Sequence, residues 1–454
     1  MQSVLNTDAF DRRRFDQLFE MFKNMQKIER NGRNTFPSFR HLMGDIWASL
    51  FKMKPEILQE IPDALQMNKQ LMERIMTDKG FEEFREYTRL DDLASALGTM
   101  KYSETVLKWI EDQVQQNQAF QNALQQIMGS DGANQKAGQQ AAKALEDALE
   151  QNGQSLARSL KSAAEETVQT KENLKSLLGG VKAGSGDAEL KKVPLRDQLK
   201  LAEHLSHDRK LKEIAEWAGR MKLIAQKKQR SKHQESINRS GIAMGDQVEM
   251  LLPTELASFA SPRTKLDFLR RFAEGRTLQY DSKGKEQLGK GPIVLCLDQS
   301  SSMKSQDTIS KGFALALMSI ARRQRRDFTL ILFSDRAREP KVYHHGKISV
   351  DDMIQLATTF LSGGTDFSNA LQKALEVIQS SRFRQADVVF VTDGEDSVSD
   401  VFIKKWNELK QAKDFRVFSL LIGTEYDETV KLFSDRVVKA SSFQDDTVHA
   451  AFEI

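Results

Sequence analysis

A change of pattern at about Gly291 constrains the fold of this chain more than any other feature. From there to Ile454, short continuous apolar runs rich in β-branched residues alternate with amphipathic segments of helical period. Such runs separated by helices are typical of a parallel sheet covered on both faces, because each connection between parallel strands must cross over the sheet. The sequence therefore predicts an α/β domain over residues 291–454, with a doubly wound, mostly parallel sheet.

The length and period of each run place the elements of this domain. The expected strands are Ile293–Leu297, Phe328–Phe333, Asp387–Thr392 and Phe415–Ile422. The expected helices lie near Thr308–Arg325, Asp351–Leu361, Asp366–Ser380, Asp400–Lys413 and Asp427–Phe433. Ligands bind at the carboxyl ends of the strands in doubly wound sheets, so functional residues should follow the strands.

Three polar loops occur at the positions where a ligand site is expected. They are Asp298-Gln299-Ser300-Ser301-Ser302 after the first strand, Gly363-Gly364-Thr365-Asp366 before a helix, and Thr392-Asp393-Gly394-Glu395 after a later strand. Because these loops should meet at one edge of the sheet, we expect five side chains to converge as metal ligands: Asp298, Ser300, Ser302, Thr365 and Asp393. Carboxylate and hydroxyl oxygens are ligands for hard cations, so the sequence predicts Mg²⁺ or Mn²⁺.

The expected ligand set also indicates what the site does. Hydroxyls carry no charge, so two carboxylates just balance a divalent cation and leave it an electrophile with an open coordination position. An Asp or Glu side chain of another protein is the natural further ligand. We therefore predict a docking site bridged by a metal ion, with no catalytic residue and no organic cofactor.

The three motifs, in this order, resemble the metal-ion-dependent adhesion site of von Willebrand factor A domains. Asp298, Ser300 and Ser302 fall on the first motif, Thr365 on the second and Asp393 on the third. One departure is Ser301, where a small glycine is common, and Glu395 and Asp396 add acidity beside the site. The alternative interpretation is that Ser300 and Ser302 only cap the following helix.

A longer part of the chain resembles the ViaA family. The resemblance runs from Leu251-Leu252-Pro253-Thr254-Glu255-Leu256-Ala257 through Asp267-Phe268-Leu269-Arg270-Arg271-Phe272 to the first expected strand. Members are bacterial cytoplasmic proteins with a helical N-terminal region and a C-terminal von Willebrand domain, and they work with MoxR-type AAA+ ATPases. The resemblance thus implies a MoxR-type AAA+ ATPase and a client protein as partners, whereas the residues alone imply only an acidic partner.

The chain before residue 291 is predicted to be largely α-helical. Apolar residues recur at helical spacing over 1–128, which indicates a helical domain. Residues 129–190 are rich in Ala, Gln, Glu, Lys, Ser and Gly, so we expect a weakly packed helical arm or insertion there. Its thin apolar stripe consists of Leu145, Leu149, Leu156 and Leu160. A further helical region over 191–290 contains a basic stretch and a linker.

The sequence predicts a cytoplasmic protein without a transmembrane segment. Its longest apolar stretch, Gly312–Ala321, is too short to cross a bilayer, and residues 1–14 contain no apolar signal-peptide core. The single cysteine, Cys296, excludes an internal disulfide and lies in an apolar run where a buried thiol is expected. A net charge of +3 on 454 residues gives no general reason to expect nucleic-acid binding.

Two alternative functions remain open. The first is a metal-dependent hydrolase or phosphotransferase at Asp298, although a phosphotransferase would favour a second acid where Ser300 stands. A serine hydrolase would need a base, and the nearest histidines in sequence, His344 and His345, lie in an expected edge hairpin. The second is a protein that binds nucleic acid or lipid through the basic run Arg220–Arg239, which lacks interleaved aromatic residues for base stacking.

Overall fold

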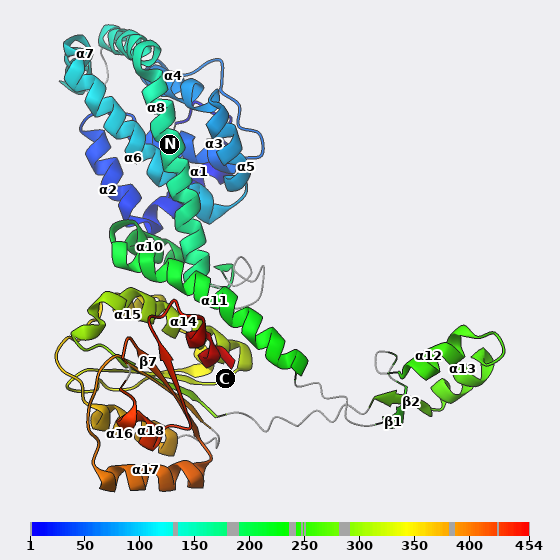
Figure 1. Cartoon of the computed structure of the whole chain (residues 1–454). Coiled ribbons are helices and arrows are strands. Elements are labelled where there is room, and N and C mark those ends of the chain that lie inside the picture. The colour runs from blue at the N-terminus through cyan, green and yellow to red at the C-terminus, as the bar shows by residue number, and fades with distance from the viewer. Residues whose placement is uncertain are drawn as a thin grey trace. The chain divides into compact units, whose positions relative to one another are not determined.

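The computed structural model describes residues 2–129, 135–178, 190–235, 242–246, 248, 251–280, 291–380, 386–424 and 426–453. These residues divide into two compact units (Figure 1). The first unit contains the described residues within 1–178, 190–216 and 349–358, and the second contains those within 217–348 and 359–453. The segment Ser349–Thr358 therefore belongs, by its contacts, to the unit that contains the N-terminal residues.

The first unit is α-helical, as the apolar periodicity predicted. Its elements are α1 (Ala9–Met21), α2 (Lys23–Arg33), α3 (Phe39–Phe51), η1 (Asp63–Leu65), α4 (Gln66–Met76), α5 (Lys79–Thr88), α6 (Asp92–Gln116), α7 (Gln118–Gly129), α8 (Gln135–Leu178), α10 (Leu195–His207) and α15 (Val350–Thr358). Asp8, Asp78 and Asp91 each accept a hydrogen bond from a backbone N–H of the helix that follows. These caps satisfy N–H groups that have no partner inside the helix and so define where α1, α5 and α6 begin.

The core of the first unit lies around α3 and α6. Nearly every residue of α3 is buried, and Trp47 stacks on Phe51 with ring centroids 4.9 Å apart. Helix α8 packs against α4, α5, α6 and α7, and its stripe residues Leu145, Leu156 and Leu160 are buried. Residues 135–178 thus form one helix of this unit, whereas the boundaries 1–128, 129–190, 191–290 and 291–454 stay predictions.

A buried carboxylate on α3 holds the N-terminal segment. The Asp45 side chain is fully buried, and its Oδ1 accepts hydrogen bonds from the Val4 N–H at 3.2 Å and from the Ser3 hydroxyl. Its Oδ2 has no hydrogen-bond partner among the described residues. Burial disfavours the charged form and raises the pKa of Asp45 to about 7. The fold therefore holds a proton on Asp45 at a pH where an unfolded chain has lost it.

We expect Asp45 to make the stability of the protein depend on pH. The ordinary pKa is 3.8, so the stabilisation is fully present below that value and is lost as the pH rises through about 7. Urea-unfolding midpoints measured from about pH 5 to about pH 8 should fall in the wild type and stay flatter in Asp45→Asn. Asp16→Asn, at a partly exposed ion pair with Arg40, is the control. An equal slope in Asp45→Asn would contradict this account.

The second unit contains a six-stranded sheet that includes the four strands predicted for the C-terminal domain. The strands are β3 (Ile293–Asp298), β4 (Phe328–Phe333), β5 (Lys341–Tyr343), β6 (Asp387–Thr392), β7 (Arg416–Ile422) and β8 (Arg436–Ala440). They pair in the order β5-β4-β3-β6-β7-β8, and every neighbouring pair is parallel except β4 and β5. The predicted fold class, a mostly parallel α/β sheet preceded by a largely helical region, is confirmed. No strand was predicted at β8, and β5 was expected only as part of an edge hairpin near His344 and His345.

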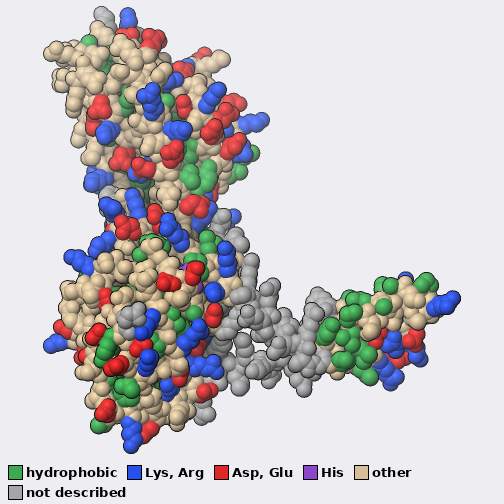
Figure 2. Space-filling model, viewed as in Figure 1, with side chains coloured by type: hydrophobic (Ala, Val, Ile, Leu, Met, Phe, Trp, Pro, Cys, Tyr) green, Lys and Arg blue, Asp and Glu red, His purple; other side chains and the backbone are tan. Residues whose placement is uncertain are grey.

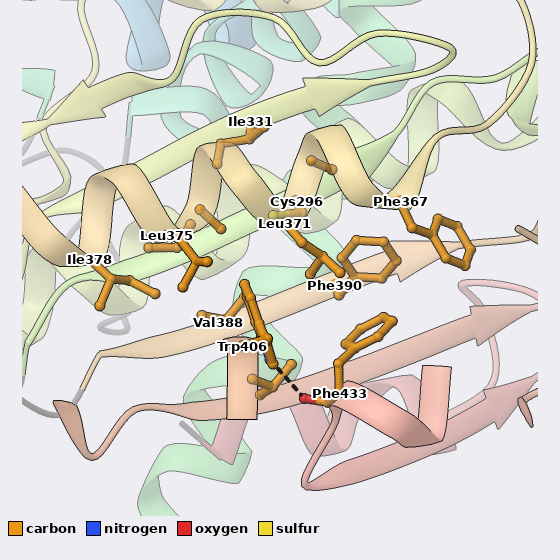
Figure 3. Close-up of a cluster of buried hydrophobic side chains, with 14 of the residues drawn as sticks. Cys296, Ile331, Phe367, Leu371, Leu375, Ile378, Val388, Phe390, Trp406 and Phe433 are labelled. Carbon is orange, nitrogen blue, oxygen red and sulfur yellow. Dashed lines mark hydrogen bonds between the residues drawn. The ribbon is translucent and has the colours of Figure 1, made fainter. Parts of the chain in front are cut away.

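Helices flank this sheet and are separated from it by a dense apolar core. The helical elements of the second unit, apart from those between β1 and β2, are α11 (Arg209–Glu235, from Trp217 onward), η3 (Ser302–Gln306), α14 (Asp307–Gln324), η4 (His344–Gly346), α16 (Phe367–Ser380), α17 (Asp400–Lys413), α18 (Glu428–Phe433) and η5 (Asp446–Glu453). Side chains of α16, α17 and α18 join those of β3, β4, β6 and β7 in one buried cluster (Figure 3). No described helix is long and apolar enough to cross a membrane.

An aromatic residue of β6 occupies the middle of this cluster. The Phe390 ring centroid lies 5.1–5.3 Å from the rings of Phe333, Phe367 and Phe433. Trp406 of α17 donates an indole hydrogen bond of 3.1 Å to the Phe433 carbonyl (Figure 3). These contacts join the sheet to three helices, so the central strands cannot shift without disturbing the helices.

Truncation of this central ring should destabilise the protein strongly. Phe390→Ala should lower the free energy of unfolding by about 3–5 kcal/mol, because the surrounding rings can collapse only partly into the cavity. Val401→Ala, at a side chain that is 82% exposed on α17, should change it by less than about 0.5 kcal/mol. Chemical denaturation of the full chain measures both values, and similar losses in the two variants would contradict the proposed core.

A small segment of the second unit consists of two short strands and two short helices. These are β1 (Ile242–Gly245), α12 (Pro253–Ala260), α13 (Lys265–Ala273) and β2 (Thr277–Tyr280), and the two strands pair antiparallel. The carboxylate of Glu255 is buried, pairs with Arg271 at 2.7 Å and accepts a hydrogen bond from the Leu278 N–H at 3.1 Å. Hydrophobic side chains gather on its surface (Figure 2), and Leu266 is 80% exposed. The sequence predicted helices here but not the two strands.

Candidate metal centre

The strand order brings two polar loops to one point of the sheet. The chain leaves β3 for its neighbour β4 on one side and later returns to β6 on the other side. The carboxyl ends of β3 and β6 are therefore adjacent at the switch point, where doubly wound sheets bind their ligands. Asp298 ends β3 and Thr392 ends β6, and the parallel register pairs the residues just before them, Leu297 and Val391.

The oxygen atoms of three predicted ligands form a continuous row. The hydroxyls of Ser300 and Ser302 lie 3.0 Å apart, and the Ser302 hydroxyl donates to Oδ1 of Asp393 at 2.8 Å. Ligand oxygens about 2.1 Å from an octahedral Mg²⁺ would lie about 3.0 Å from one another. The observed spacing and the donor types therefore fit a small hard cation.

The other two predicted ligands lie at the same edge. Asp298 is followed directly by the serine loop, and its Oδ1 accepts a hydrogen bond of 2.8 Å from the Ser300 N–H. Thr365 packs on the residue after Asp393, because its Oγ1 would lie 3.0 Å from a Cβ atom placed on Gly394. The structure thus brings all five predicted residues together, and their role as metal ligands stays a prediction.

The serine hydroxyls do not cap the following helix. The N-terminal caps of η3 and α14 are Ser301 and Gln306, and neither side chain makes a capping hydrogen bond. The hydroxyls of Ser300 and Ser302 are directed instead to each other and to Asp393. This geometry disfavours the interpretation of these serines as helix caps and leaves them available as oxygen donors.

Thr392 is a site residue that the sequence analysis did not identify. Its buried hydroxyl donates a 2.5 Å hydrogen bond to Oδ2 of Asp298 and accepts one of 3.0 Å from the Gly394 N–H. It therefore orients the Asp298 carboxylate and the loop that carries Asp393. Its position as the last residue of a strand, directly before that acid, was the available sequence signal.

The electrostatics of the site favour a bound cation. Burial raises the pKa of Asp298, and the negative charge of Asp393 raises it further. Burial also raises the pKa of Asp393. Both shifts show that the protein alone stabilises these two charges poorly, which a cation would correct. Within the described residues no three His, Cys, Asp or Glu side chains are grouped to hold a metal ion, so any site here depends on hydroxyl ligands.

Known proteins are similar to this chain both in part of the C-terminal domain and over longer stretches of its sequence. The model for the von Willebrand factor type A domain matches residues 293–395, which include all five predicted ligands. An uncharacterized protein of Methanocaldococcus jannaschii is 26% identical over 456 residues, which cover 100% of this chain and 99% of that protein. A second one from this organism is 32% identical over 273 residues, 60% of this chain and 69% of that protein. Regulatory protein ViaA of Photorhabdus laumondii is 28% identical over 225 residues, 42% of this chain and 45% of that protein.

The chain is a ViaA-like von Willebrand factor A protein. The matched domain, residues 293–395, begins with the first residue of β3 and ends two residues after Asp393. The family therefore accounts for the strands and loops that position the site.

The alternative functions find little support in this ViaA-like structure. The N–H of His345 bonds to Asp327, which directly precedes β4, so His344 and His345 lie at the amino ends of the strands, away from Ser300. The basic run Arg220–Arg239 lies partly on α11, where Lys222 is buried, Arg220 stacks on Trp217 and Lys228 pairs with Glu453. The side chains from 229 to 241 lie outside the described residues.

The hydroxyl of Thr392 should be needed for stability even without a metal ion. Thr392→Val should lower the free energy of unfolding by about 1–3 kcal/mol, because it leaves Oδ2 of Asp298 and the Gly394 N–H without their hydrogen-bond partner. Thr392→Ser retains the hydroxyl and should stay nearer to the wild type. Urea denaturation in EDTA provides the comparison, and equal stability of the two variants would contradict the role assigned to the hydroxyl.

Proposed function

We propose that this protein is a non-enzymatic adaptor that docks an acidic residue of a partner protein through a Mg²⁺ or Mn²⁺ ion. Asp298, Ser300, Ser302, Thr365 and Asp393 would hold the ion. The observation that carries the proposal is the row of hydroxyl and carboxylate oxygens, 2.8–3.0 Å apart, at the switch point of the sheet. A bound dication would supply a positive charge and an open coordination position for a carboxylate.

The protein groups at this edge favour docking over catalysis. Both oxygens of Asp298 already accept hydrogen bonds, from the Ser300 N–H and from the Thr392 hydroxyl. A carboxylate held in this way is oriented as a ligand and is a poor nucleophile. The Ser302 hydroxyl donates to Asp393, so its proton points toward a ligand and not toward a general base such as histidine.

The proposed partners follow from the family. A relative of this chain carries the name regulatory protein ViaA, which supports a protein partner. The resemblance nominates a MoxR-type AAA+ ATPase and a client protein that offers an Asp or Glu, with no nucleic acid involved. A cytoplasmic location is part of the same proposal. In this arrangement the chain catalyses no reaction, and substitutions at the metal site change only the formation of the complex with its partners.

A metal titration combined with a binding assay tests this function. Calorimetry of the purified chain should detect Mg²⁺ or Mn²⁺ binding, and Asp298→Ala should abolish it. Association with a MoxR-type ATPase or its client should weaken in EDTA and recover with Mg²⁺. Asp393→Ala and Thr365→Ala should weaken it to a similar extent, and added Mg²⁺ should not restore Asp393→Ala, because a ligand of the ion is missing.

Matched variants make this test specific. Glu408→Ala removes an exposed carboxylate on α17 and should leave both metal binding and association unchanged. Circular dichroism should show that each site variant retains its fold. A complex that forms equally well in EDTA and with every site variant would rule out metal bridging, even with the ATPase as the true partner.

A further inference from the structure

The two loops that contribute Ser300, Ser302 and Thr365 are fastened to each other directly. The Ser301 hydroxyl accepts a hydrogen bond of 3.0 Å from the Gly363 N–H and lies 2.9 Å from the Ser362 hydroxyl. Two backbone bonds of 3.0 Å, from Ser301 N–H to Gly363 and from Ser362 N–H to Gln299, complete the contact. Two of these four contacts therefore depend on the side chain of Ser301, which is not a predicted ligand.

The serine at position 301 is a departure from the pattern that this site resembles. A small glycine is common there, and a glycine would retain the backbone bond to Gly363 while losing both contacts of the hydroxyl. Ser301 has right-handed helical backbone angles, φ −61° and ψ −31°, and its side chain is exposed. Neither backbone strain nor burial therefore requires a serine here. The contacts of its hydroxyl with Ser362 and Gly363 are the structural reason for a serine at this position.

The segment that Ser301 holds has an unfavourable backbone conformation. Ser362 has a φ of 61° and Gly363 a φ of 100°, which place both residues in the left-handed region. A residue with a side chain reaches that region at a cost of order 1 kcal/mol or more, so Ser362 keeps this conformation only if neighbouring groups hold it. The groups that do so include the Ser301 hydroxyl, and Thr365 follows only three residues after Ser362.

The two ends of the same loop are anchored to other elements. The fully buried amino group of Lys311 on α14 pairs with Asp307 at 2.7 Å and donates a hydrogen bond of 2.7 Å to the Thr359 carbonyl. At the other end the Asp366 N–H donates a hydrogen bond of 2.7 Å to the Ser334 carbonyl after β4. Between these anchors, the strained turn at 362–363 is the part whose position Ser301 determines.

We propose that Ser301 is a positioning residue that holds the Thr365 loop in its ligand-binding place before any ion is present. This inference rests on the proposed metal site and adds a residue outside the ligand set. The loop would then need no rearrangement on metal binding, so the free energy of ordering it would not be subtracted from the affinity. Loss of the hydroxyl should weaken metal binding without removing a ligand.

Mn²⁺ titration followed by electron paramagnetic resonance tests the role of Ser301 in the full-length chain. Ser301→Ala and Ser301→Gly should each weaken Mn²⁺ binding about tenfold, the effect of one or two lost hydrogen bonds. Ser301→Thr retains a hydroxyl and should restore most of the affinity. Ser397→Ala, an exposed serine in the loop after β6, is the control and should bind as the wild type does.

A double-mutant cycle separates positioning from a general effect on stability. If Ser301 acts through Thr365, Ser301→Ala should have little further effect on Mn²⁺ affinity in a Thr365→Ala background. Fully additive losses, or wild-type affinity in Ser301→Ala, would overturn the positioning role. In either case, loss of binding in Asp298→Ala would leave the proposed metal site intact. An absence of Mn²⁺ binding in the wild type would instead reject the proposed function and this inference together.

Discussion

The parallel pairing of β3 with β4 on one side and β6 on the other is the constraint on which the C-terminal structure depends. All six residues of β3 are buried, so a slip of one residue would exchange the side chains that pack on its two faces and would move Asp298 out of register with the end of β6. The register therefore follows from packing, and it places Asp298 beside the end of β6. Two carboxylates that repel each other are thus held close by the free energy of the apolar core, not by any attraction within the site.

Part of this architecture could be read from the sequence because the relevant signals are strong. The strands β3, β4, β6 and β7 are long apolar runs, and the helices between them have a clear 3.6-residue period. No residue range was predicted for the edge strands β5 and β8, because they have only three and five residues, too few for a periodic pattern to be recognised. Backbone hydrogen bonds to a neighbouring strand define them, and no local pattern records such a partner.

In the candidate site, too, the residues marked by their side-chain type were predicted, and the roles that depend on contacts or on backbone geometry were not. Asp298 and Asp393 were found because acids directly after buried strands are informative. The roles of Thr392 and Ser301 were not predicted, since each depends on a contact made across loops distant in sequence. The positive φ of Ser362 could not be predicted from residue propensities either. In the helical unit, the buried Lys171 pairs with Asp91, so a polar residue stands where the period alone would place an apolar one.

Helix α15 has a consequence for how the chain is made. Its residues lie in sequence within the C-terminal domain, yet by their contacts they belong to the first unit, where Asp351 pairs with Lys200, 151 residues earlier. A chain synthesised from its N-terminus can assemble the other helices of that unit early, but it cannot add α15 until β3 and β4 have also left the ribosome. The two units are therefore interleaved in folding order, and the helical unit stays incomplete until β3 and β4 have been synthesised, for a time set by the rate of translation.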